Sequence, residues 1–208
     1  MIAYFPDEQM VYTTVRKSEV CTFGILSIQL SVAITHDVLW RERMTIRELT
    51  STDMSVYQAL MLCGLQEHPE SFRISAQDAG EPMVPFASNH SDSFTLGAWL
   101  DGGQLAGVVS FARETQEKLR HKGLLYRMYV RGEASGRGIG RKLVQEVVKR
   151  ARAIEGLEHI NLTVVSLNVQ AKSLYTSEGF TSFAREERGL KIGESYFDEE
   201  QMTLHLFK

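Results

Sequence analysis

The spacing of hydrophobic residues alternates between strand-like and helix-like from residue 44 onward. In the first half of this region, short apolar segments predict four strands, at 46–49, 94–100, 104–111 and 124–130. Asp101-Gly102-Gly103 is a tight-turn sequence between the second and third of these strands, so the two are expected to pair as a hairpin. The front half of the domain is therefore expected to be antiparallel.

A helix is predicted between the first two strands, with Leu60 and Leu65 on its apolar side. Ser51 or Thr52 can cap its start, and His68-Pro69 interrupts it. The polar stretch 79–92 contains two prolines and is interpreted as a loop. This loop would join the helix to the predicted hairpin.

The second half of the chain predicts a strand, loop, helix and strand unit followed by further short elements. A glycine-rich loop at 136–140 leads into a helix. The apolar face of that helix consists of Ile139, Leu143, Val147, Ala151 and Ile154, and Gly156 marks its expected end. A strand at 159–165, a short helix at 171–178 stopped by Gly179, and strands at 181–187 and 201–206 complete the pattern. This order of elements indicates the α/β class.

The first 43 residues lack a clear period and are expected to be an N-terminal extension to a domain at 44–208. A true start at Met44 is the alternative. The segment 21–39 comes closest to a signal sequence, but polar residues interrupt it and no clean small-residue cleavage site follows. No apolar run in the sequence reaches the length that spans a bilayer.

Composition and net charge limit the kinds of molecule that the chain is expected to bind and the compartment that it is expected to occupy. The 208 residues include 43% hydrophobic and 24% charged residues, as in ordinary soluble globular proteins. The formal net charge of −3 gives no overall electrostatic reason to expect binding to nucleic acid or to an anionic membrane. The two cysteines, Cys21 and Cys63, make no disulfide framework and fit a reducing compartment, so a cytoplasmic location is expected.

The loop Gly136-Arg137-Gly138-Ile139-Gly140 has the features of an anion-binding site. A helix start presents unpaired N–H groups and a positive dipole end, and glycines allow a phosphate to approach the backbone closely. The loop lacks the Gly-Lys-Ser/Thr end of a Walker A motif and the third glycine of a dinucleotide-binding motif, which disfavours ATP and NAD. A pyrophosphate is the expected ligand, and a simple tight turn is the alternative.

Several motifs together resemble the acetyl-CoA core of the GNAT superfamily of N-acetyltransferases. They are Met128-Tyr129-Val130, Gly136-Arg137-Gly138-Ile139-Gly140, Asn168, Ala171, Leu174-Tyr175 and Gly179-Phe180. In the loop, Gly138 and Gly140 match the family pattern, whereas Ser135 stands where the family has Arg or Gln. The resemblance covers about residues 44–206 and is strongest at 124–180.

The resemblance implies a GNAT-like acyl-CoA N-acyltransferase fold. This fold has a mixed central sheet of about seven strands, flanked by helices and splayed between the fourth and fifth strands. The co-substrate would be acetyl-CoA, and no metal is expected. The pantetheine arm would bind the free backbone of Met128, Tyr129 and Val130. The pyrophosphate would contact Gly136, Arg137, Gly138, Ile139, Gly140 and Arg141. Asn168 would bond to the pantetheine or to the loop, with a helix N-cap as the alternative role.

Tyr175 is implied by the same resemblance to be the general acid that protonates the departing CoA thiolate, and to contact the cofactor. A buried core tyrosine beside Phe180 is the alternative. The general base stays open. Glu114 and His121 are candidates near the ends of predicted strands, Glu133 is a less attractive one, and a water chain is another possibility.

The expected reaction is acetyl transfer from acetyl-CoA to a primary amine of a small molecule. By family analogy, the segments 51–75 and 79–92 and the last hairpin would border the acceptor. A protein N-terminal or lysine acetyltransferase and a non-catalytic acyl-CoA-binding sensor are the alternatives. The chain is expected to act as a monomer or homodimer, without a nucleic-acid or membrane partner.

Overall fold

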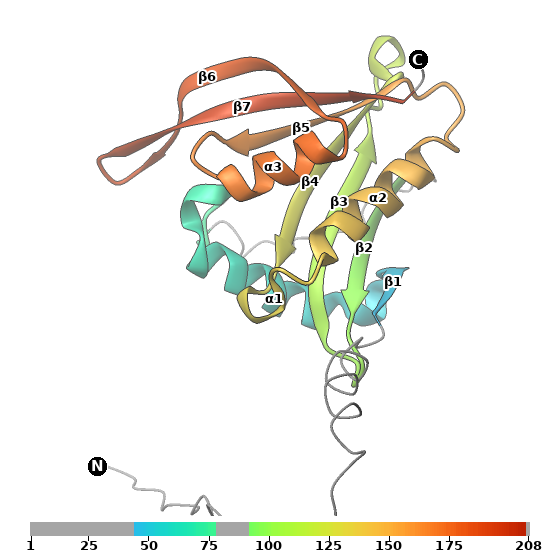
Figure 1. The fold of residues 1–208 in the computed structure, drawn as a ribbon, viewed down its shortest axis with the longest axis vertical. Helices are drawn as coiled ribbons and strands as arrows, with labels where there is room; N and C mark the ends of the chain where they lie inside the picture. The colour runs from blue at the N-terminus through green and yellow to red at the C-terminus, as the bar shows by residue number, and fades with distance from the viewer. Residues whose placement is uncertain (1–43, 78–91, 207–208) are drawn as a thin grey trace, which may run out of the picture. The chain divides into compact units, whose positions relative to one another are not determined.

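A mixed seven-stranded sheet forms the centre of the domain (Figure 1). The computed structural model describes residues 44–77 and 92–206. The strands lie in the order β1-β2-β3-β4-β5-β7-β6. They are β1 (Thr45–Glu48), β2 (Ser93–Trp99), β3 (Leu105–Arg113), β4 (Lys122–Val130), β5 (His159–Val165), β6 (Thr181–Ile192) and β7 (Ser195–His205). β4 and β5 are parallel, and every other neighbouring pair is antiparallel. The predicted fold class is confirmed.

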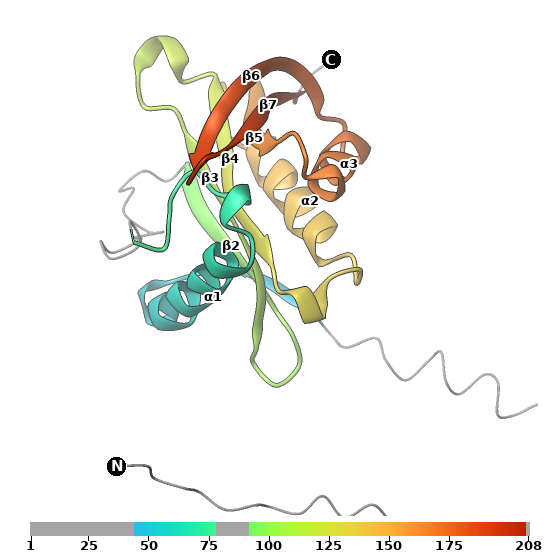
Figure 2. The ribbon, with the colours of Figure 1, turned by 90° about the vertical axis from the view of Figure 1, so that its left-hand side faces the viewer.

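Helices cover both faces of the sheet (Figure 2). They are α1 (Met54–Glu67) on one face, and α2 (Ile139–Ala151) and α3 (Val169–Ser177) on the other. Tyr57, Leu60 and Leu65 of α1 are buried against the α1 face of the sheet. The predicted apolar face of α2 belongs to a second hydrophobic core, on the other face of the sheet. Within the described residues, no helix is both long and apolar enough to cross a membrane.

Most boundaries differ from the sequence prediction by one or two residues, and three differences are larger or add an element. α2 ends at Ala151 rather than at Gly156, and Ile154 packs against the core from the turns that follow. The last hairpin is longer than expected, because its outer part is mostly exposed on both faces and so shows no hydrophobic period. A short 3₁₀ turn, Ser51–Asp53, precedes α1 and moves the cap to Thr50. The predictions for 1–43, and for 79–92 apart from Asp92, lie outside the described residues.

The start of α1 is held by a bidentate ion pair. Both guanidinium Nη atoms of Arg47 donate to the Asp53 carboxylate at 2.7 Å, and the backbone N–H of Thr50 donates to it at 2.9 Å. The side chain of Asp53 is only 9% exposed. The hydrogen bonds from Arg47 hold the pKa of Asp53 well below its usual range. The charged form of Asp53 therefore stabilises the folded state.

We expect Asp53→Asn to lower the free energy of unfolding at neutral pH by about 1–3 kcal/mol, the range for hydrogen bonds to charged groups. The folded-state pKa is depressed, so this contribution is present above the unfolded pKa of about 4 and is lost as the pH falls below it. The difference between wild type and variant should shrink in acid. Urea unfolding at several pH values measures this, and equal midpoints at neutral pH would contradict it.

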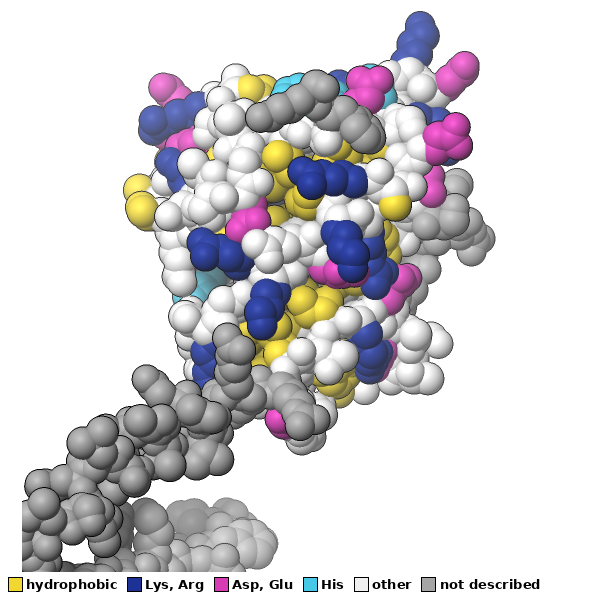
Figure 3. Space-filling view, turned by 45° about the vertical axis from the view of Figure 1, so that its right-hand side comes forward, with side chains coloured by type: hydrophobic (Ala, Val, Ile, Leu, Met, Phe, Trp, Pro, Cys, Tyr) yellow, Lys and Arg dark blue, Asp and Glu magenta, His cyan; other side chains and the backbone are white. Residues whose placement is uncertain are grey.

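Charged side chains on the outer side of α2 are interspersed in sign. Arg150 lies 3.1 Å from Glu146, one turn away, and 2.9 Å from Glu48 of β1. On the face shown in Figure 3, Lys and Arg side chains lie in separate groups, several of them beside acidic ones. The outer side of α2 is therefore an ordinary solvated helix surface with ion pairs.

β4 and β5 separate after a short paired segment. Their pairing is limited to Lys122–Leu124 of β4 with His159–Asn161 of β5. Farther along, β4 contains a bulge, because Tyr126 and Tyr129 are three residues apart but pair with Ser110 and Val108, which are two apart. Arg127 inside the bulge has a positive φ of 50°. A bulge bends its strand. This bulge lies beyond the segment in which β4 and β5 pair, at the splay that was predicted between the fourth and fifth strands.

Candidate active site

A cavity of about 860 Å³ opens where β4 and β5 separate. Its walls come from β4, the glycine loop, the start of α2, the end of β5 and α3. Residues 68 and 70–72, after α1, complete it on one side. The cavity therefore brings together most of the segments in which the sequence placed candidate site residues.

The glycine loop forms one end of the cavity. Gly136 and Gly138 have φ of 76° and 75°, a region that residues with a side chain rarely adopt, and Gly138 is the N-cap of α2. A Cβ at either position would meet no atom within 4 Å, so the space in front of the loop is open. A Cβ on Gly140 would lie 3.2 Å from Met128 Cε, so this glycine serves packing. The start of α2 thus presents N–H groups to an open space, as a phosphate requires.

The two arginines of the loop are placed differently. Arg141 lines the cavity, where its Nε lies 3.1 Å from Glu178 and its Nη2 donates to Ser177 at 3.2 Å. Arg137 is exposed and is not part of the cavity wall. Ile139 lines the cavity and is itself buried in the core. Of the two arginines, Arg141 is the one placed to add positive charge near the glycine loop.

The three predicted cofactor-binding residues of β4 all line the cavity. Beyond Leu124 the backbone of β4 has no partner in β5, so its polar groups are available to an extended ligand. The phenol of Tyr129 instead donates to Glu67 at 2.6 Å, and its ring lies where a Cβ on Gly64 would be only 2.9 Å away. Burial raises the pKa of Tyr129, and the hydrogen bond to Glu67 raises it further. Tyr129 therefore anchors α1, and its backbone contributes to the cavity.

Asn168 has the N-cap role that the sequence left as the alternative, and its bond to the pantetheine or to the loop stays a prediction. Its Oδ1 accepts from the backbone N–H of Ala171 at 3.0 Å, which makes it the N-cap of α3. It also lines the cavity. The cap holds the side chain in place at the cavity wall.

Tyr175 lies on α3 and lines the cavity with only 6% of its surface exposed. Its ring packs edge-on against Phe180, with 5.8 Å between centroids. Burial raises the pKa of its phenol above the usual range, so the group stays protonated at neutral pH. A protonated phenol at the cavity wall can donate a proton to a ligand.

Glu114 and His121, the sequence candidates for the base, do not line the cavity. The backbone N–H of Glu114 donates to Lys122 at the first residue of β4, and His121 directly precedes that strand. The cavity wall begins at Leu125, three residues farther along β4, which is roughly 10 Å at about 3.3 Å per residue. Glu133 is also absent from the wall. The turn between β3 and β4 lies at the paired end of the sheet, and this places both candidates away from the cavity.

Four ionisable residues that the sequence interpretation did not select line the cavity, and they are His68, Glu70, Tyr126 and Arg127. His68 and Glu70 follow α1, and His68 Nδ1 lies 3.8 Å from Glu70 Oε1. The sequence showed His68-Pro69 only as a helix interruption. The sequence signal for His68 and Glu70 was a polar segment directly after an apolar helix. The position of this segment beside the splayed strands depends on the tertiary fold.

Comparison with known proteins agrees with this geometry. A GNAT-family acetyltransferase from Streptococcus pneumoniae is 25% identical, with a TM-score of 0.69, over 78% of this chain and 99% of that one. A phosphinothricin acetyltransferase from Sinorhizobium meliloti, solved with acetyl-CoA, is 16% identical, with a TM-score of 0.69, over 78% and 88%. A ribosomal-protein-alanine N-acetyltransferase from Brucella melitensis is 21% identical, with a TM-score of 0.63, over 77% and 99%.

Sequence comparison points to the same family. A search of curated protein sequences finds no match to the chain. A model of the acetyltransferase (GNAT) family matches residues 54–180, which is more than half of the chain and includes the glycine loop and Tyr175. The chain therefore belongs to the GNAT acetyltransferase family.

Proposed function

We propose that the protein transfers the acetyl group of acetyl-CoA to a primary amine of a small molecule. The observation that carries the proposal is the single cavity that joins the open glycine loop, the unpaired edge of β4 and the buried phenol of Tyr175. These parts fit the pyrophosphate, the amide-rich arm and the thioester of acetyl-CoA in that order. Family membership and the acetyl-CoA complex of the Sinorhizobium enzyme support the same assignment.

Different residues would bind the cofactor, orient it and transfer protons. N–H groups at the start of α2 bind phosphate oxygens, and the free backbone of β4 orients the arm. Bound acetyl-CoA supplies an activated acetyl group on a thiol leaving group. A bond forms between the acceptor nitrogen and the carbonyl carbon, the carbon–sulfur bond breaks, and Tyr175 gives its proton to the sulfur. An ammonium acceptor loses one proton to a base before it attacks, and it loses a second proton after the carbon–nitrogen bond has formed. That second proton balances the one that Tyr175 gives to the sulfur.

We assign the role of that base to His68 or Glu70, which line one side of the cavity. The negative charge of Glu70 would attract an ammonium group, and His68, whose Nδ1 lies 3.8 Å from Glu70, is a second group that could take the proton. The acceptor would then enter beside the segment after α1, opposite the glycine loop. The cytoplasmic location and the monomeric or dimeric state inferred from the sequence remain predictions.

The test is calorimetric titration with acetyl-CoA, followed by a free-thiol assay with a panel of small amines and of peptides with free N-termini. Binding together with thiol release on small amines supports the proposal. Turnover on peptides alone would favour a protein acetyltransferase, which is the reaction named for the Brucella protein. Binding without turnover on any amine would indicate a sensor, and no binding would overturn the proposal.

For Glu70→Gln we expect kcat/KM for the amine to fall by about tenfold or more, because a group that attracts and deprotonates the acceptor is lost. The Kd for acetyl-CoA should not change, because Glu70 is not part of the glycine loop or of β4, where we place the cofactor. Steady-state kinetics and calorimetry measure the two effects. Glu133→Gln is the matched control, since Glu133 is acidic and outside the cavity wall. Unchanged kinetics in both Glu70→Gln and His68→Asn would favour a water chain instead.

A further inference from the structure

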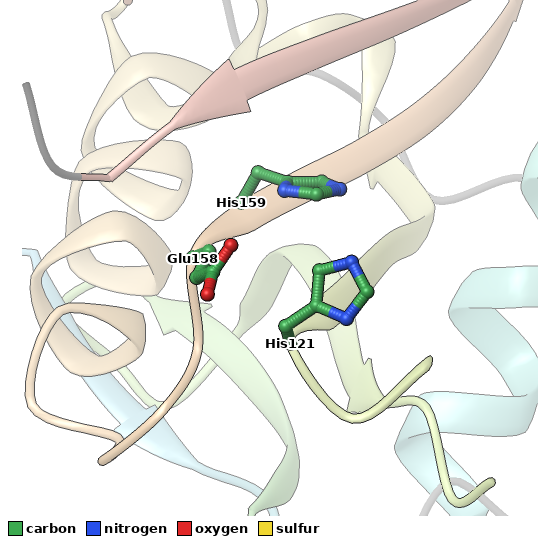
Figure 4. Close-up of side chains that lie close together, drawn as sticks. All are labelled: His121, Glu158 and His159. Carbon is green, nitrogen blue, oxygen red and sulfur yellow. The ribbon is translucent and has the colours of Figure 1, made fainter. Parts of the chain in front are cut away.

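A group of metal-ligating side chains lies at the paired end of β4 and β5, away from the cavity. His121 directly precedes β4, and Glu158 and His159 stand at the start of β5. Their ligand atoms all lie within 4.8 Å of one another. Figure 4 shows the three side chains gathered in the space between the two strand starts.

The backbone holds these residues in place without help from the side chains. The N–H groups of Glu158 and His159 donate to the carbonyl of His121 at 2.8 and 3.3 Å. The carbonyl of Glu158 accepts from Leu206 at 2.8 Å, and His159 pairs with Lys122 across the sheet. The three ligand-bearing residues are therefore in fixed relative positions before any ion binds, and their positions do not depend on rare backbone conformations.

The chemistry of the group suits a particular class of ion. Two imidazole nitrogens and one carboxylate oxygen match the ligand preference of Zn²⁺ and similar transition metals rather than of Mg²⁺ or Ca²⁺. Metal–ligand bonds of about 2.1 Å place tetrahedral ligands about 3.4 Å apart, so modest side-chain rotations would close the site.

We propose that His121, Glu158 and His159 bind one divalent transition-metal ion of the Zn²⁺ class. Three protein ligands leave a fourth position for water. The ring of His205 stands beside the site, with 5.5 Å between its centroid and that of His159. The ion would join β4 to β5 at the segment where these two strands pair. It would therefore stabilise the end of the sheet at which β4 and β5 are still in contact.

The test is a calorimetric titration of the metal-free, full-length chain, prepared without a histidine tag, with ZnCl₂. We expect one ion per chain in wild type. Removal of a direct ligand in His159→Ala should weaken binding by about tenfold or more, at least the loss that outer-shell changes cause. Glu158→Gln should do the same with almost no change in size. Glu155→Gln, an exposed acid in the preceding turn, is the matched control and should bind as wild type does.

Two further measurements keep the proposal open to refutation. Zn²⁺ should raise the thermal unfolding midpoint of wild type and of Glu155→Gln, but not that of His159→Ala. Co²⁺ bound to wild type should show visible absorption bands that are lost in His121→Ala. Absence of binding by wild type would overturn the proposal. Equal affinity in wild type, His121→Ala and His159→Ala would also overturn it, because the ion would then be bound elsewhere on the chain.

Discussion

Replacement of Gly138 by valine is expected to weaken acetyl-CoA binding by about a hundredfold. Gly138 has a φ of 75°, where a β-branched residue costs about 1–2 kcal/mol, and the loop would change conformation to relieve that strain. The new side chain would also occupy the open space where we place the phosphates. The loss of one or two charge-assisted hydrogen bonds, about 3 kcal/mol in total, corresponds to a factor of about 100 in Kd.

The matched control for this substitution is Gly103→Val. Gly103 has a φ of 80° and equally open surroundings, but it lies in the β2–β3 turn outside the cavity wall. Both variants should lose a similar amount of stability in thermal unfolding. Calorimetry should show normal acetyl-CoA affinity for Gly103→Val alone. Equal affinity in the two variants would refute the role of the glycine loop in phosphate binding.

Replacement of Tyr175 by phenylalanine should lower kcat by about tenfold to a hundredfold, at or below the lower limit of the range for general acid catalysis. The effect is limited because a thiol has a pKa of about 8.5, so the CoA thiolate is already a fair leaving group. Burial raises the pKa of Tyr175, so the wild-type phenol remains a proton donor across neutral pH. The ring of phenylalanine can keep the packing against Phe180.

Three measurements separate the catalytic role of Tyr175 from a structural one. The unfolding midpoint and the Kd for acetyl-CoA should stay close to those of wild type, while single-turnover acetyl transfer slows. The control is Thr176→Val, which removes a hydroxyl from an exposed position of α3 outside the cavity wall and should leave kcat unchanged. A fully active Tyr175→Phe enzyme would make Tyr175 a core residue only.

The fold was predictable from the sequence where a hydrophobic period was present. The apolar face of α2 and the Asp101-Gly102-Gly103 turn are both as expected. The prediction was incomplete in the β6–β7 hairpin, where exposed polar residues extend the strands beyond any hydrophobic pattern. In that hairpin, backbone pairing between the strands continues without burial.

The sequence by itself determined the α/β order of elements and the position of the glycine loop at the start of α2. A helix start with glycines attracts phosphate wherever it stands, because its N–H groups and dipole are local properties. Tyr175 was selected through the resemblance of its motif to the GNAT family, and the structure places it on α3 at the cavity wall.

The tertiary structure alone decided which ionisable groups lie together. Glu114 and His121 are near strand ends in the sequence, but the β3–β4 turn places them at the paired end of the sheet. His68 and Glu70 line the cavity because α1 crosses the sheet and ends at the splayed strands. The proposed metal ligands come from segments far apart in the chain. Contacts of this kind depend on the register and twist of paired strands, which no local spacing specifies.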